Sequence, residues 1–130
     1  MSPVPKLVGV HPVLVEKITR VLIAMDALGV PMTITAGLRT AEQQRALYEQ
    51  GRTKPGAIVT NADGYTKKSN HQEREDGYGH AVDLAFLVAG KPSWAESHPW
   101  ALYGAMVKSQ ELKWGGDWES ISDRPHAELP

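Results

Sequence analysis

Cysteine is absent from this sequence of 130 residues. Disulfide bonds and thiolate zinc sites are therefore excluded, and a metal ion could be bound only by histidine and carboxylate side chains. An excess of one charge is also absent, because 14 basic residues face 15 acidic ones and leave a formal net charge of −1. A nucleic-acid-binding domain would need a basic face, so we expect no nucleic-acid partner.

Long apolar runs are missing as well. The longest wholly apolar run in the first predicted helix is Val21 to Met25, whereas a membrane-spanning helix needs about 20 such residues. The N-terminal segment has two early prolines, which favour an extended lead-in over residues 1–10, and it lacks the apolar core of a secretory signal. We therefore expect no stable membrane association and no signal peptide.

The composition that remains, with 42% hydrophobic residues, fits a single globular domain over residues 1–130. Apolar residues recur at three- and four-residue steps from Pro12 to Leu28, which predicts a helix that ends at Gly29. A second helix should begin after Thr40, which forms a capping box with Gln43, and end before residue 52.

The rest of the chain predicts short strands and one more helix. After a turn at 91–92, Ser93 is expected to cap that helix, which runs to about Ser109. Its buried residues are expected to be Leu102, Ala105 and Met106, with Trp94 or Trp100 as an option. Residues 52–68 are expected to form a loop, with a short strand at 57–60 as an option. The three predicted strands are Met32–Ala36, Ala81–Leu87 and His126–Leu129.

Three polar residues at separated positions could converge on one metal ion. His71 lies on a predicted loop, Asp83 stands between two alanines in a predicted strand, and His126 begins the last strand. Three protein ligands with an open position for water are typical of a catalytic zinc rather than a structural one. Asp123, three residues before His126, could act as a general base there, although its surroundings are also ordinary turn chemistry. Glu128 is the alternative base or a partner of His126.

Other histidines and one arginine remain in competition for roles. His80 is a rival ligand to His71, because a bend at Gly79 could bring it to the side of Asp83. In a regular strand it would face the opposite side. Arg39 could hold a substrate carboxylate or a developing oxyanion with its planar guanidinium, or could form a surface salt bridge. His11 and His98 are expected to be ordinary polar residues beside helix starts.

Five motifs occur in a fixed order: GLRTAEQQRALYEQGRTKPGAIVT, S-x-H, G-x-A-x-D, WGGDW and D-x-P-H. Together, from about Gly37 to Leu129, they resemble the bacteriophage endolysins that are L-alanyl-D-glutamate peptidases. These belong to the zinc peptidase group that also holds D-alanyl-D-alanine carboxypeptidases and dipeptidases. The resemblance implies an α+β fold, a compact single domain in which about three helices flank a small antiparallel sheet that carries the zinc site. It also implies that no separate cell-wall-binding domain is present.

The same resemblance implies roles for individual residues. One Zn²⁺ per chain would be bound by His71, Asp83 and His126, Asp123 would be the catalytic base, and Arg39 would polarise the scissile carbonyl. Ser69 would lie near the substrate or the ligands. One feature departs from the family: eleven residues separate His71 from Asp83, about five more than usual. This acidic insertion could be a substrate-facing flap or a longer solvated loop, and we favour the loop.

The implied function is hydrolysis of the L-alanyl-D-glutamate bond in peptidoglycan stem peptides, leading to lysis of the host cell. A D,D-carboxypeptidase that removes terminal D-alanine is the alternative, and a non-catalytic cell-wall-binding module is a third. The resemblance further implies a monomer made in the host cytoplasm that reaches the periplasmic wall once a holin has permeabilised the membrane.

Overall fold

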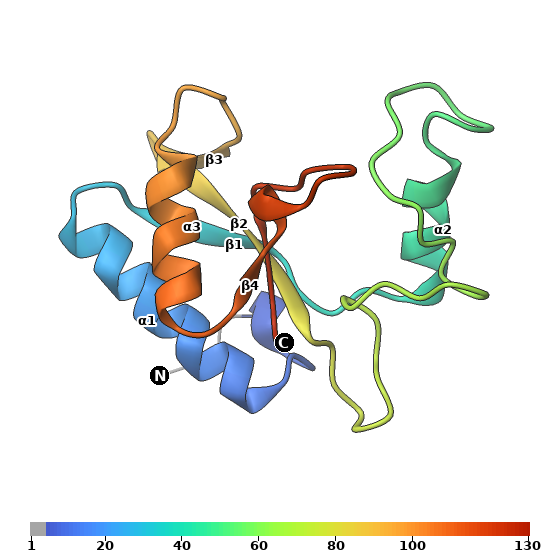
Figure 1. Cartoon of the computed structure of the whole chain (residues 1–130), viewed down its shortest axis with the longest axis horizontal. Helices are drawn as coiled ribbons and strands as arrows, with labels where there is room; N and C mark the ends of the chain where they lie inside the picture. Colours follow the sequence, from blue (N-terminus) through green and yellow to red (C-terminus); the bar gives the residue numbers. More distant parts are fainter. Residues whose placement is uncertain (1–4) are drawn as a thin grey trace.

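An antiparallel sheet of five strands forms the frame of the molecule in the computed structural model, which describes residues 5–130 (Figure 1). Its strand order is β1-β2-β5-β4, and β3 pairs with the far end of β2. The predicted α+β class is confirmed. The strands are β1 (Met32–Ala36), β2 (Ala81–Val88), β3 (Lys91–Ser93), β4 (Lys113–Trp114) and β5 (His126–Glu128); the helices are α1 (Pro12–Ala27), α2 (Ala41–Glu49) and α3 (Trp100–Ser109), with 3₁₀ turns η1 (Pro5–Leu7) and η2 (Gly115–Asp117).

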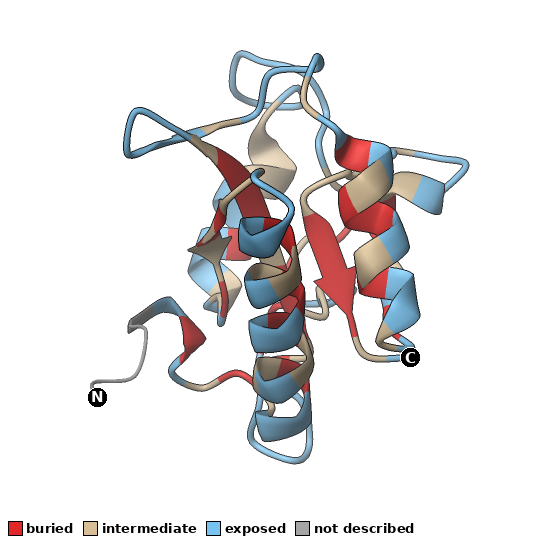
Figure 2. Cartoon of the chain, turned by 90° about the vertical axis from the view of Figure 1, so that its left-hand side faces the viewer, coloured by how far each residue is buried: buried red, intermediate tan, exposed pale blue. Residues whose placement is uncertain are grey.

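Strand β2 separates the core from the candidate site. Successive side chains of a strand point to opposite faces, so Val82, Leu84 and Phe86 enter the hydrophobic core while Asp83 faces the other way. The helices α1 and α3 pack beside each other against the core face, with their buried stripes turned inward (Figure 2). One face of the sheet is therefore sealed by helices, and the other carries polar groups.

Helix α1 forms as its periodicity predicts. Its buried residues are Leu14, Ile18, Val21 and Met25, and burying a side chain of this size contributes about 1.5–3 kcal/mol. The stripe is narrower than the sequence suggested, because Val13 and Leu28 are exposed.

Helix α2 stands on the opposite side of the molecule from α1 and α3 (Figure 1). The predicted capping box is present: Thr40 Oγ1 accepts from the Gln43 backbone N–H at 3.1 Å, and Gln43 Oε1 accepts from the Thr40 N–H at 2.9 Å. The optional strand at 57–60 does not form, because these residues pair with no strand of the described chain. Instead, Asp63 organises the following loop by accepting backbone N–H bonds from residues 65, 66 and 67.

The region around residues 89–109 differs from the sequence prediction. Ala89 and Gly90 adopt positive φ angles of 51° and 78°, and this tight turn returns the chain as β3 where only a turn was expected. Since Ser93 is paired in β3, it cannot cap α3, which begins after Pro99 instead. The later start also shifts the buried face to Trp100, Tyr103, Gly104 and Val107, and leaves the alanine at 105 exposed.

The N-terminal prediction was partly wrong. Residues 1–4 lie outside the described part of the chain, and η1 occupies Pro5–Leu7 where an extended segment was expected. Across the described residues, no helix combines the length and apolar character required of a membrane span.

Candidate metal centre

Strand pairing brings Asp83 and His126 side by side. β2 runs antiparallel to β5 with Asp83 opposite His126, and β1 places Ala36 on the other side of Asp83. The start of β5 is fixed through Pro125, whose carbonyl accepts from the Tyr103 hydroxyl at 2.8 Å and from the Leu84 N–H at 3.0 Å. The two side chains therefore project from a rigid part of the sheet.

His71 reaches the same point from a loop, and the backbone after β1 holds it there. Its carbonyl accepts from the Arg39 N–H at 2.8 Å, and its Nδ1 donates to the Gly37 carbonyl at 2.9 Å. That bond places the imidazole proton on Nδ1 and leaves the lone pair of Nε2 free. Ser69 Oγ accepts from the His71 N–H at 3.2 Å. The buried His71 ring is thus oriented before any ligand arrives.

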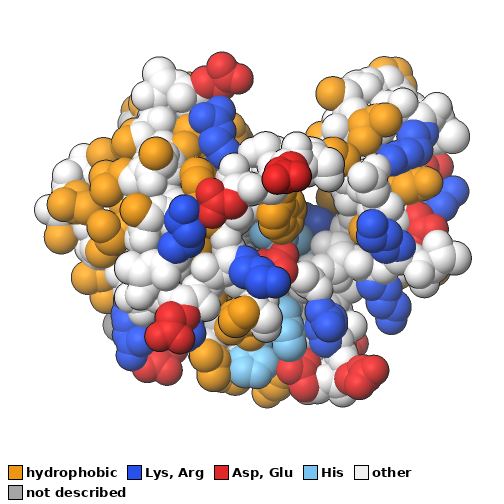
Figure 3. All heavy atoms as spheres, viewed as in Figure 1, with side chains coloured by type: hydrophobic (Ala, Val, Ile, Leu, Met, Phe, Trp, Pro, Cys, Tyr) orange, Lys and Arg blue, Asp and Glu red, His pale blue; other side chains and the backbone are white. Residues whose placement is uncertain are grey.

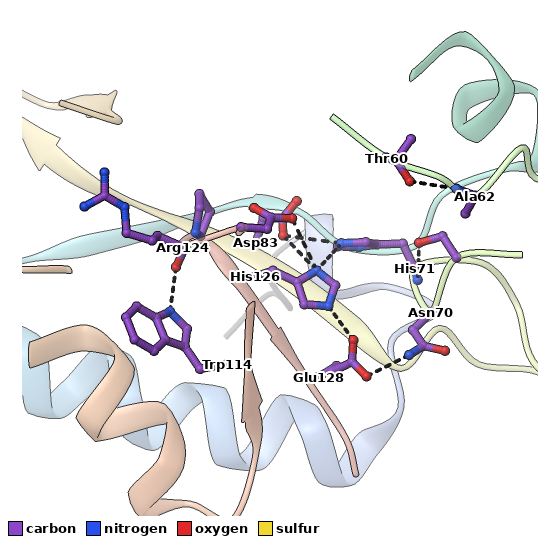
Figure 4. A network of polar contacts seen from close by, with 12 residues as sticks. Thr60, Ala62, Asn70, His71, Asp83, Trp114, Arg124, His126 and Glu128 are labelled. Carbon is purple, nitrogen blue, oxygen red and sulfur yellow. Dashed lines mark hydrogen bonds and ion pairs between the residues drawn. The ribbon is translucent and has the colours of Figure 1, made fainter. Parts of the chain in front are cut away.

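The three candidate ligand atoms form an almost equilateral triangle (Figure 4). His71 Nε2 lies 3.2 Å from His126 Nδ1 and 3.3 Å from Asp83 Oδ1, and His126 Nδ1 lies 3.4 Å from the same oxygen. Zinc–ligand bonds of about 2.0–2.2 Å in tetrahedral geometry place neighbouring ligand atoms roughly 3.3–3.6 Å apart. The triangle therefore matches one face of a zinc tetrahedron.

Asp83 Oδ1 is buried and has no hydrogen-bond partner among the described residues. Burial alone would raise the pKa of Asp83, but the facing imidazoles of His126 and His71 hold it well below its usual range. The carboxylate is thus charged, and a buried charged oxygen without a partner is costly unless it is paired or coordinates a metal. This orphaned oxygen fits a zinc ion at the centre of the triangle.

Glu128 supports His126 from behind. Its Oε1 lies 2.7 Å from His126 Nε2, the nitrogen on the far side of the ring from the ligand atom Nδ1, and its Oε2 accepts from Asn70 Nδ2 at 2.8 Å (Figure 4). Burial would lower the pKa of His126, but the facing carboxylates of Asp83 and Glu128 raise it to about 9. Of the two roles left open by the sequence, the position of Glu128 fits a partner of His126 and not a base.

Asp123 lies on the ligand side of His126, with Oδ2 3.8 Å from Nδ1. Burial and the negative charge of Asp83 raise the pKa of Asp123 above its usual value. Its backbone N–H donates to the Gly115 carbonyl at 2.9 Å, and a Cβ on Gly115 would lie 2.3 Å from the Asp123 carbonyl oxygen. Glycine is therefore required in the WGGDW corner because the Asp123 backbone packs directly against it.

Arg39 approaches Asp83 from the opposite side, with Nη2 3.6 Å from Asp83 Oδ2. Its Nη1 donates to Gln44 Oε1 at 2.8 Å, and Gln44 is in turn held by the Ala62 carbonyl at 2.9 Å and the Thr60 hydroxyl at 3.2 Å. The burial of Gln44 and its contact with Arg39 were not predicted from the sequence. Its place among polar residues of an amphipathic helix gave no sign that it would be buried.

These residues lie in an open groove of about 910 Å³. One wall comes from α2 and the loop that follows it, including Val59, Lys67 and Lys68, and the other comes from residues 117–123, including Trp118. Figure 3 shows this hollow between the α2 side and the centre of the molecule. Ser69 also lines the groove.

The other histidines lie outside this triangle. His80 Nε2 lies 2.7 Å from Asp76 Oδ2, and His11 Nε2 lies 3.8 Å from the same oxygen. The structure therefore groups His71, and not the rival His80, with Asp83. His98 bonds the Ser93 hydroxyl at 2.8 Å and stacks on a core phenylalanine.

Comparison with known proteins agrees with the resemblance. Residues 63–129 match the model of a peptidase M15 family described as D-alanyl-D-alanine carboxypeptidase. The chain is 32% identical to the peptidoglycan L-alanyl-D-glutamate endopeptidase CwlK of Bacillus subtilis, over 98% of this chain and 76% of that protein. It is 29% identical to the Serratia marcescens L-Ala D-Glu endopeptidase ChiX, with a TM-score of 0.68, over 96% of this chain and 84% of that one.

A solved structure of the vancomycin-resistance D,D-pentapeptidase VanY in complex with Zn(II) shares the fold at 14% identity, with a TM-score of 0.63 over 92% of this chain and 72% of that one. The expected zinc cofactor is consistent with the histidine and aspartate triangle of this chain. The family match over residues 63–129 and the similarity to CwlK over 98% of this chain lead to one conclusion: the chain is an enzyme of the M15 metallopeptidase family.

Proposed function

We propose that this protein hydrolyses the L-alanyl-D-glutamate bond of peptidoglycan stem peptides. The observation that carries the proposal is the triangle of His71 Nε2, Asp83 Oδ1 and His126 Nδ1, with sides of 3.2–3.4 Å, at the base of an open groove. CwlK and ChiX, whose names state this bond, resemble the chain over most of their length.

His71, Asp83 and His126 would hold the zinc ion, which when bound lowers the pKa of a coordinated water and polarises the substrate carbonyl. Asp123 would take a proton from the attacking water and return it to the leaving amine. The raised pKa of Asp123 suits both steps, because a general base works best when its pKa approaches the working pH.

Arg39 would stabilise the negative charge that develops on the scissile carbonyl oxygen. Its Nη1 is held by Gln44, its Nη2 lies 3.6 Å from Asp83 Oδ2, and the residue lines the groove. Ser69 would contact the substrate at the groove wall while its oxygen also supports the His71 backbone. Lys67 and Lys68 add positive charge along the same wall, which suits the carboxylates of an acidic stem peptide.

Replacing Asp123 by asparagine tests the role of this residue. We expect wall hydrolysis to fall about 100- to 10,000-fold, since the proton acceptor is lost, while one zinc per chain is still bound. The matched control is Asp26→Asn on the exposed side of α1, which should behave as wild type. Activity of Asp123→Asn within tenfold of wild type would exclude this role.

Analysis of the reaction products distinguishes an endopeptidase from a D,D-carboxypeptidase. The second activity is the one named in the description of the matched family. Purified stem peptide is digested and the products are weighed by mass spectrometry. Fragments that divide between L-alanine and D-glutamate support our proposal, and release of free D-alanine supports the alternative. A zymogram on Gram-negative cell walls that shows no clearing, with or without chelator, would instead favour a non-catalytic wall-binding module.

We further propose that the protein acts as an endolysin that reaches the periplasmic wall of its host after a holin has permeabilised the membrane, and that it works as a monomer. The support is the order of the endolysin motifs from Gly37 to Leu129. Expression in a Gram-negative host with and without a membrane-permeabilising protein tests this route. Lysis only in the first case supports it, and lysis in both cases contradicts it.

A further inference from the structure

The loop of residues 72–78, which we call the inserted loop, follows His71 directly and leads towards β2. It closes on itself through two backbone bonds of 2.9 Å between Arg74 and residues 77 and 78. Its first residue, Gln72, bonds Ser69 and the Gly64 carbonyl. Beyond that residue the loop is attached at two further points, through the carboxylate of Asp76 and the guanidinium of Arg74.

The first attachment is the contact of the Asp76 carboxylate with two imidazoles. His80 Nε2 lies 2.7 Å from Asp76 Oδ2, and His11 Nε2 lies 3.8 Å from it. These residues could also be read as a metal site. However, His11 Nδ1 accepts the Val13 N–H at 3.1 Å as the cap of α1, so neutral His11 carries its proton on Nε2. Because His11 Nε2 faces Asp76 as a proton donor, the cluster is better explained as an ionic contact than as a metal site.

The second attachment begins a chain of hydrogen bonds that ends at the metal centre. Arg74 Nη1 donates to Asn70 Oδ1, Asn70 Nδ2 donates to Glu128 Oε2 at 2.8 Å, and Glu128 Oε1 lies 2.7 Å from His126 Nε2. An arginine can only donate and a carboxylate can only accept. The Asn70 amide between them therefore has a single satisfying orientation, and each member of the chain fixes the next.

We propose that Asn70 and Arg74 are positioning residues, through which the inserted loop holds Glu128 against His126 and so sets the orientation of the His126 ring at the metal. This inference rests on the proposed function in one respect, since it takes His126 as a zinc ligand. Partners that orient a ligating histidine typically change metal affinity by about 10–100-fold when removed. The effect should decrease along the chain away from His126.

Zinc affinity, measured by competition with a chelator, tests this chain of hydrogen bonds without relying on peptidase activity. We expect Glu128→Ala to weaken binding about 10–100-fold, Asn70→Asp about tenfold because two carboxylates would then face each other, and Arg74→Ala about two- to fivefold. Arg20→Ala is the matched control, because Arg20 is an exposed, ion-paired arginine on α1. In addition, the visible spectrum of the cobalt-substituted protein should change in Asn70→Asp and not in Arg20→Ala.

A double-mutant cycle decides whether Arg74 acts through Glu128. In the Glu128→Ala background, Arg74→Ala should cause no further loss of zinc affinity, because the chain is already broken. The proposal is overturned if both Asn70→Asp and Arg74→Ala bind zinc within twofold of wild type, or if Arg74→Ala has the same effect in both backgrounds. Arg74 is exposed, so its truncation should leave the fold intact. Zinc binding by the wild type and its loss in His126→Ala test the metal centre separately.

Discussion

Zinc uptake by this protein should release a proton from His126. The ring nitrogen Nδ1 faces Asp83 Oδ1 at 3.4 Å and Nε2 faces Glu128 Oε1 at 2.7 Å, so two carboxylates favour the protonated imidazole. Although burial works in the opposite direction, the pKa of His126 is raised to about 9. Zinc requires the lone pair of Nδ1, and the proton on that nitrogen must therefore leave.

The magnitude follows from that pKa. At pH 8 a group with a pKa of about 9 is about 90% protonated, so His126 should release about 0.9 proton for each zinc bound. Zinc affinity should fall as the pH is lowered, by roughly 80-fold between pH 8.5 and pH 6.5 from this group alone. Without zinc, the stability of the fold changes with pH in the opposite direction from the zinc affinity. The raised pKa of His126 stabilises the folded protein fully below pH 6.5, the pKa of an unfolded histidine, and this stabilisation is lost as the pH rises through about 9.

Isothermal titration calorimetry at pH 8 in buffers of different ionisation enthalpy measures the number of protons released. Chelator competition from pH 6.5 to 8.5 measures the affinity. In Glu128→Gln one of the two carboxylates is lost, so the pKa of His126 and the number of protons released at pH 8 should both fall. Equal heats in all buffers, or an affinity that does not change with pH, would refute the reasoning.

Two further substitutions test the supports of the site. Gly115→Ala should destabilise the protein by about 1–3 kcal/mol, because the new Cβ would lie 2.3 Å from the Asp123 carbonyl oxygen; a thermal melt unchanged from wild type would contradict this close packing. Gln44→Leu should lower kcat/KM about tenfold, because the Arg39 guanidinium loses its hydrogen-bond partner. It should also lower the free energy of unfolding by about 1–3 kcal/mol, because the Ala62 carbonyl is left unpaired. Zinc binding should not change. Wild-type kcat/KM in a folded Gln44→Leu protein would show that Arg39 needs no such support.

Local features of the fold could be predicted because neighbouring residues determine them. The spacing of Leu14, Ile18 and Val21 is sufficient to specify α1, and the Thr40 capping box depends on only four consecutive residues. Helix α3 was placed less well, since the pairing of Ser93 with β2 moved its start and its buried face. Strand pairing of that kind depends on residues distant in sequence, and the local pattern does not contain it.

For the candidate site, the sequence by itself determined the chemistry. Without cysteine, a zinc ion could use only histidine and carboxylate, and the three-residue step from Asp123 to His126 already placed an acid beside a ligand. The tertiary structure decided which groups meet. Bonds from the backbone after β1 turn His71 toward Asp83, whereas Asp76 of the inserted loop keeps His80 outside. Spacing along the chain could not distinguish the two histidines, because the path of a loop is set by hydrogen bonds to distant segments.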